Sequence, residues 1–254
     1  MTDPMKQWTA ALVVIGDEIL SGRTQDKNVA QVAIWLNDQG IRLTEVRIVP
    51  DDSGRIGEAV NAMRGAYDYC FTTGGIGPTH DDITVDAIAA ALGVGVVVHP
   101  AARAILEDYY RGRPGGLTDA RLRMARVPEG AELIANPSSG APGVRVGNVF
   151  ILAGVPHIAA AMLNALTGTL EGGRTIVSVI VGARAPESDV AELLRQTEAD
   201  HPGVAVGSYP FFKDGLYGAN FVIRSEDPEL AERCGEALQD GLRQAGFEPV
   251  AGGI

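Results

Sequence analysis

The segment Thr72–Thr84 combines glycines and acids in a way that suits the binding of a phosphorylated ligand. It reads TTGGIGPTHDDIT and lies between an apolar segment, which predicts a buried strand, and the start of a predicted helix. Glycines let backbone N–H groups approach an anion closely, and a helix N-terminus adds partial positive charge. The adjacent Asp81 and Asp82 suit a divalent cation that neutralises the phosphate. A strand-to-helix turn in which an aspartate caps the helix has the same residue types, so pattern alone leaves this alternative open.

The segment differs from two common nucleotide-binding motifs. The chain has no Gly-Lys-Ser/Thr sequence of the P-loop type. The glycines Gly75 and Gly77 are not followed by the third glycine of a dinucleotide-binding fingerprint. A phosphate site in this loop would therefore be of another type.

Acids also follow two other predicted strands. Asp17 comes after the apolar segment 9–15, and Asp51 comes after the segment 41–49. The carboxyl ends of parallel strands meet at one edge of a sheet, where open α/β folds bind their ligands. We therefore expect Asp17, Asp51 and Asp82 to converge on one pocket, although each of them alone has the features of an ordinary turn residue.

The arrangement of apolar segments predicts an α/β fold. The expected strands are 9–15, 41–49, 67–73 and 148–153, and 94–98 is either a strand or a short core segment. The expected helices are 27–39, 53–64, 83–92 with Thr84 as N-cap, 101–110, 117–126 and 158–166. Strands and helices that alternate in this way favour a doubly wound, mostly parallel sheet with helices on both faces, a three-layer architecture.

A smaller domain is expected after a glycine-rich linker. Residues 167–174 contain three glycines, and strands 175–181, 204–208 and 218–224 alternate beyond them with helices 187–200 and 228–245. Asp227 followed by Pro228 is a strong helix start. We expect a domain over 8–168 and a small α+β domain over 174–250.

The composition limits the classes of function. With 254 residues and 46% hydrophobic content, the chain can bury a large core. Its net charge of −11 disfavours nucleic acid and anionic membranes as partners. We find neither an export signal nor an apolar run near the roughly 20 residues of a membrane helix, and we expect a cytoplasmic protein. Two cysteines fit neither a disulfide framework nor a zinc site.

Five motifs occur in this order along the chain: Gly16–Gly22, Val49–Asp51, Thr72–Thr84, Asn136–Gly143 and Leu152–Pro156. Taken together, they resemble the molybdopterin-binding (MoaB/Mog) superfamily. The nearest resemblance is to the N-terminal part of competence/damage-inducible protein A (CinA) and to the related domain of FAD synthases. Ser208-Tyr209-Pro210 is also similar to the small domain that follows in CinA-type proteins.

The resemblance implies a pocket for a pterin phosphate or an adenine-containing diphosphate. Asp51 and Asp82 match the catalytic acids of the superfamily, and Asp51, Asp81 and Asp82 could hold a divalent cation, Mg²⁺ or Co²⁺. The residues expected to bind the ligand belong to the glycine-rich loop or lie near it. They are Asp17, Ser21, Thr73, Gly74, Gly75, Gly77, Pro78, Thr79, His80 and Thr84.

Three functions follow as hypotheses. The resemblance favours a metal-dependent pyrophosphatase acting on FAD or ADP-ribose. It also implies that the protein forms a homo-oligomer, either a dimer or a trimer. The alternative is a non-catalytic protein that binds molybdopterin or a nucleotide, or that acts in molybdenum-cofactor biosynthesis. A third hypothesis is a scaffold whose acidic small domain recruits a partner. The glycine-rich loop disfavours this hypothesis, because a scaffold has no need of such a loop.

Two residues depart from the family pattern. Ala153 stands where the family usually has proline, and Ile158 stands where CinA-type members commonly carry glutamate. If that glutamate helps to bind metal or nucleotide, the activity of this protein is weakened or altered.

Overall fold

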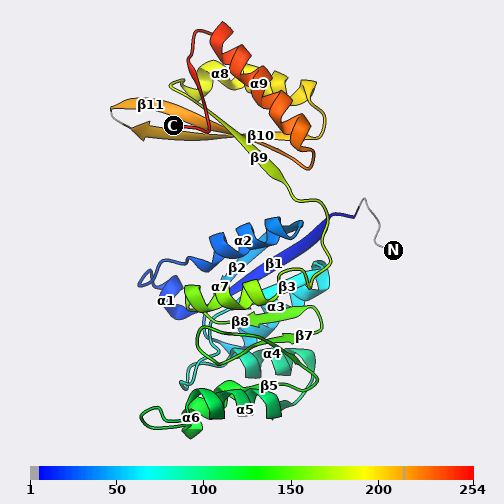
Figure 1. The fold of residues 1–254 in the computed structure, drawn as a ribbon, viewed down its shortest axis with the longest axis vertical. Coiled ribbons are helices and arrows are strands. Elements are labelled where there is room, and N and C mark those ends of the chain that lie inside the picture. Colours follow the sequence, from blue (N-terminus) through cyan, green and yellow to red (C-terminus); the bar gives the residue numbers. More distant parts are fainter. Residues whose placement is uncertain (1–5, 214) are drawn as a thin grey trace. The chain divides into compact units, whose positions relative to one another are not determined.

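The computed structural model describes residues 6–213 and 215–254. They form two compact units, the first ending at Gly173 and the second beginning at Arg174 (Figure 1). None of the helices in these ranges has the length and apolar character needed to cross a membrane.

The first unit is built on a six-stranded sheet with the order β2-β1-β3-β8-β7-β6. Strand β1 is parallel to β2 and β3, and β3 is parallel to β8, whereas β7 is antiparallel to both β8 and β6. The predicted α/β fold with a mostly parallel sheet is therefore confirmed, with two antiparallel strands added at one edge. The strands are β1 Trp8–Ile15, β2 Ile41–Val49, β3 Tyr69–Thr73, β6 Glu132–Ile134, β7 Gly143–Val146 and β8 Val149–Leu152.

Helices cover both faces of this sheet and create two cores. Helices α2 and α7 pack on one face, and α3 and α4 pack on the other. Strand β1 contributes alternate residues to both cores, which explains why its sequence is a continuous apolar run. The helices are α2 Asn28–Asp38, α3 Ser53–Ala66, α4 Thr84–Leu92 and α7 Pro156–Ala165.

The segment between α4 and β6 differs from the sequence prediction. The helix expected over 117–126 is only the short α6 Asp119–Leu122, followed by the 3₁₀ turn η1 Arg123–Ala125. The chain then becomes extended, because β5 Arg126–Pro128 pairs antiparallel with β4 Val96–Val98 and buries Val127. This long-range pairing overrides the local helical pattern. This segment also contains α5 Pro100–Tyr109.

The second unit has a four-stranded antiparallel sheet with the order β10-β11-β9-β12. Its core is formed by one face of the sheet and two helices, and Phe221 is fully buried in it. As predicted, Asp227 caps the long helix: its Oδ1 accepts hydrogen bonds from the backbone of Glu229 and Leu230. The elements are β9 Val177–Ala183, α8 Glu187–Asp200, β10 Val204–Lys213, β11 Leu216–Ser225, α9 Pro228–Gln244 and β12 Pro249–Ala251.

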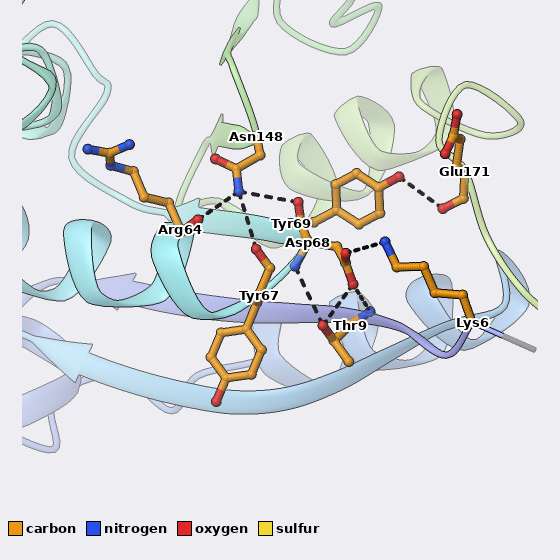
Figure 2. A network of polar contacts seen from close by, with 8 residues as sticks. All are labelled: Lys6, Thr9, Arg64, Tyr67, Asp68, Tyr69, Asn148 and Glu171. Carbon is orange, nitrogen blue, oxygen red and sulfur yellow. Dashed lines mark hydrogen bonds and ion pairs between the residues drawn. The ribbon is translucent and has the colours of Figure 1, made fainter. Parts of the chain in front are cut away.

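Figure 2 shows a polar network that ties the start of β1 to the start of β3. Asp68 Oδ2 accepts hydrogen bonds from Thr9 N and Thr9 Oγ1, both at 2.9 Å, and Asp68 Oδ1 lies 2.6 Å from Lys6 Nζ. Asn148 Nδ2 donates to the carbonyl oxygens of Tyr67 and Asp68. Burial raises the pKa of Asp68, but the hydrogen bonds from Lys6 and Thr9 outweigh burial and hold that pKa below its ordinary value.

Replacing Asp68 with asparagine is expected to destabilise the first unit by about 1–3 kcal/mol at neutral pH, because the ionised carboxylate accepts these bonds. The folded pKa lies below the unfolded one. The contribution is therefore present above the unfolded value, about 3.9, and is lost as the pH falls through the folded pKa. Urea unfolding of the wild type and of Asp68→Asn at several pH values checks this, since the two curves must converge in acid.

The control is Glu107→Gln, which removes an exposed ion pair with Arg103. Such surface pairs contribute about 0–1 kcal/mol, so this variant should stay close to the wild type. A difference between the wild type and Asp68→Asn that is constant from neutral to acid pH would contradict the role given to the ionised Asp68.

Candidate functional site

The ends of β1 and β2 are joined directly. Gly16 N donates a hydrogen bond to Val49 O at 3.1 Å, and Asp17 N donates to Asp51 Oδ2 at 3.0 Å. The parallel arrangement of the strands therefore places Asp17 beside Asp51, and the Asp51 side chain binds the first residue of the short helix α1 Asp17–Leu20. This helix was not predicted.

The glycine-rich loop leaves β3 in a conformation that requires glycine. Gly74 and Gly75 have φ angles of +105° and +65°. Gly74 N donates to Leu152 O at the end of β8, at 3.2 Å. Thr84 then fixes the other side of the loop, since its N donates to Gly75 O at 3.0 Å and its Oγ1 donates to Gly74 O at 2.9 Å.

The role of Thr84 corrects one prediction. The N-cap of α4 is Ile83, and Thr84 is the first residue of the helix. The Thr84 hydroxyl is buried against the glycine loop, where it satisfies the Gly74 carbonyl. It therefore ties the loop to the helix rather than capping the helix.

The acids at the far end of the loop have different environments. Asp82 Oδ2 accepts hydrogen bonds from Thr79 N at 2.8 Å and from Thr79 Oγ1 at 2.5 Å, which fixes the carboxylate beside Gly77. In contrast, Asp81 is exposed, and the His80 side chain is 99% exposed. Of the acids in the loop, only Asp82 is held against the glycines.

A pocket of about 500 Å³ lies along this loop. Five of the predicted ligand-binding or catalytic residues line it: Gly74, Gly75, Gly77, Pro78 and Asp82. Much of the remaining wall is apolar. This wall includes Ile76, Met124, Ala141, Ala153, Val155, Ile158 and Met162. Its size and lining suit a ring system held by a few polar groups.

Sequence reasoning missed the polar part of the pocket wall, which is formed by Glu18, Thr24, Asn136 and Ser139. Asn136 organises this wall, since its Nδ2 donates to Ser139 Oγ and to Ala141 O, both at 2.7 Å. The signal was available, because Glu18 and Asn136 belong to motifs that carried the family resemblance. Their role depends on segments that meet only in the folded chain.

A smaller cavity of about 60 Å³ adjoins the pocket and shares Glu18 and Thr24 with it. Thr73, a predicted ligand-binding residue, lines this cavity. Its Oγ1 is buried and has no hydrogen-bond partner within the described chain.

The remaining predicted residues do not line the pocket. These are Asp17, Ser21, Asp51, Thr79, His80, Asp81 and Thr84. Within residues 6–213 and 215–254, no three His, Cys, Asp or Glu side chains are grouped so that they could hold a metal ion. Asp51, Asp81 and Asp82 thus do not form a preassembled three-carboxylate site, and the requirement for Mg²⁺ or Co²⁺ stays a prediction.

The two cysteines lie in the cores rather than in the pocket. Burial raises the pKa of the Cys70 thiol to about 12 and also raises the pKa of Cys234. Both thiols are therefore protonated at neutral pH and are poor nucleophiles.

Comparison with known families divides the chain as the fold does. Residues 11–171 match the family described as "Probable molybdopterin binding domain". Residues 175–251 match the family described as "FAD synthase, middle domain".

Individual relatives agree with this division. A protein of Aeropyrum pernix is 37% identical and is matched over 96% of both chains. A Caenorhabditis elegans protein named "Probable FAD synthase" is 30% identical. The match covers 92% of this chain and 50% of that relative. The crystal structure of CinA from Thermoplasma acidophilum, described as a protein of unknown function, is 35% identical. It superposes with a TM-score of 0.59, covering 63% of this chain and 96% of that one. The predicted resemblance is confirmed, and the chain belongs to the MoaB/Mog-type family of probable molybdopterin-binding domains, with CinA and FAD synthases among its relatives.

Proposed function

We propose that the first unit binds a phosphorylated ring compound and hydrolyses its phosphoanhydride bond, with FAD or ADP-ribose as substrate. The observation that carries this proposal is the pocket of about 500 Å³, which combines an apolar wall with the glycine loop and the fixed carboxylate of Asp82. The apolar wall suits a flavin or adenine ring, and the backbone of Gly74–Gly77 suits phosphate oxygens.

Asp82 is placed to act on water. Thr79 holds its carboxylate beside Gly77, where a phosphate on the loop would lie next to it. In the proposed reaction a water oxygen bonds to the adenylyl phosphorus while Asp82 takes its proton, and the bond between that phosphorus and the bridging oxygen breaks. The products are AMP and either FMN or ribose 5-phosphate. Asp51 is a positioning residue in this proposal, because it holds the start of α1, the helix that carries Glu18.

The test is the release of AMP from FAD and from ADP-ribose, with and without Mg²⁺ or Co²⁺, followed by chromatography. Asp82→Asn keeps the shape and the acceptor oxygen but removes the base, so turnover should fall roughly 10²- to 10⁴-fold. Asp51→Ala should lower turnover less. The control is Asp119→Asn, an exposed residue of α6 outside the pocket, which should behave like the wild type.

AMP release that survives in Asp82→Asn would contradict the assignment of the base. Release that requires Mg²⁺ or Co²⁺ would show that a metal joins the site when substrate is bound, since phosphate oxygens can complete the coordination of one or two carboxylates.

One observation favours a second function, non-catalytic binding of molybdopterin or a nucleotide. Ile158 lines the pocket where CinA-type relatives commonly carry glutamate, and Ala153 lines it nearby. This apolar wall suits retention of a ring but supplies no acid. A ligand that raises the melting temperature without being consumed would favour this function, and molybdopterin would be the next ligand to test.

A further inference from the structure

A second small cavity, of about 20 Å³, is lined in part by the glycine loop. It shares the loop residues Gly75 and Gly77, together with Asp82, with the main pocket, so the two spaces adjoin along the loop. Two arginines, Arg123 and Arg126, line it. The sequence alone allows two roles for the arginine-rich segment 111–126: contact with phosphates over the pocket, or a solvated helical arm or subunit contact.

The two arginines are in different electrostatic states. Arg126 is bound to Asp86 by two hydrogen bonds, of 3.0 and 2.5 Å, so an adjacent carboxylate balances its charge. Arg123 has no such partner: its Nη2 donates to the carbonyl oxygen of Asp82 at 3.3 Å, and its Nε is buried without a hydrogen-bond partner in the described chain. A buried donor on an always-charged group is costly to leave unsatisfied, which points to an acceptor that binds there.

The main pocket needs such a cation if it binds phosphate. Its charged lining residues, among those that the structure describes, are Glu18 and Asp82, both acids. They would repel a phosphate unless positive charge lay close by. Arg123 lines the small cavity together with Gly75 and Gly77, whereas Glu18 does not line it, and Arg123 Nε has no hydrogen-bond partner in the described chain.

We infer that Arg123 is the residue that recognises the ligand's phosphate. In this inference a phosphate oxygen of the bound ligand enters the small cavity at Gly75–Gly77 and accepts a hydrogen bond from Arg123 Nε. The planar guanidinium suits phosphate oxygens better than a point charge does. This inference rests on the proposed function of the same pocket, and it names the group of the ligand from which the affinity comes.

The test compares ligands that differ only by a phosphate. Affinities of the full chain for AMP and adenosine, and for FMN and riboflavin, are measured by calorimetry. Arg123→Gln should weaken binding of AMP and FMN roughly 10- to 100-fold while leaving adenosine and riboflavin unchanged. Arg123→Lys should recover part of the loss, since it keeps the charge without the fork.

The matched control is Arg121→Gln. Arg121 precedes Arg123 by two residues, but its guanidinium lies over the Tyr110 ring and donates to loop carbonyls, away from the pocket. Arg121→Gln should bind all four compounds as the wild type does. Circular dichroism and the melting temperature establish that each variant is folded.

The outcomes are distinct. If the wild type binds AMP or FMN more tightly than the phosphate-free partner and Arg123→Gln keeps this preference, the assignment of Arg123 is overturned while the proposed function stands. If the wild type binds none of the four compounds, nor FAD or ADP-ribose, the proposed function fails and the assignment fails with it. A folded Arg123→Gln that loses the preference supports the inference.

Discussion

Replacing Phe71 with alanine is expected to lower the free energy of unfolding of the first unit by about 3–5 kcal/mol, the range for a fully buried aromatic residue. Phe71 is 0% exposed. Its ring stacks on Phe150 with the ring centroids 4.7 Å apart, and it forms a T-shaped pair with Trp35 with the ring centroids 6.0 Å apart. These rings lie in the core between the sheet and the helices α2 and α7, so a cavity there has few ways to close.

Tryptophan fluorescence during urea unfolding measures this effect in the first unit alone, because both tryptophans, Trp8 and Trp35, lie in that unit. The control is Phe221→Ala, which makes a similar cavity in the separate core of the second unit. It should leave the fluorescence transition in place while shifting part of the far-ultraviolet circular dichroism. A shift below about 1 kcal/mol for Phe71→Ala would contradict the packing described here.

Much of the fold was predictable because its signals are local. The strand over 41–49 and the helix over 187–200 occur with the bounds expected from the sequence. The continuous apolar run of β1 correctly indicated a strand buried on both faces. Prediction failed for β5, β6 and β7, because these strands have only three or four residues and show no clear periodicity in the sequence.

The site divides in the same way. The glycine loop follows from residue types and from its place between a strand and a helix, and the nearness of Asp17 to Asp51 follows from parallel strands ending at one edge. The rest of the pocket wall could not be inferred, because Asn136 comes from a loop and Ile158 from helix α7, and both meet the glycines only in the folded chain. Nor does spacing reveal that Asp86 pairs with Arg126 and leaves Arg123 unpaired, since these contacts span about 40 residues.

Replacing Gly75 with alanine is expected to weaken ligand binding at least roughly tenfold, about 1.4 kcal/mol. A Cβ at Gly75 would overlap the Thr84 hydroxyl, which is buried and bonded to Gly74 O. Thr84 cannot move aside without losing that bond, so the loop must shift out of the pocket wall. The affinity for FAD or ADP-ribose, measured beside the melting temperature, separates this local displacement from a general loss of stability.

Gly93→Ala is the matched control. Gly93 also has a positive φ, +71°, but no atom lies within 4 Å of a Cβ placed there. Both substitutions therefore carry the same backbone penalty, about 1–2 kcal/mol, and only Gly75→Ala adds the collision with Thr84. Gly93→Ala should lower the melting temperature and keep ligand affinity.

Adding Thr84→Ala to Gly75→Ala removes the colliding hydroxyl and should restore part of the affinity, because the two changes act through one contact. Equal binding by the Gly75 and Gly93 variants would show that the ligand does not lie against this loop.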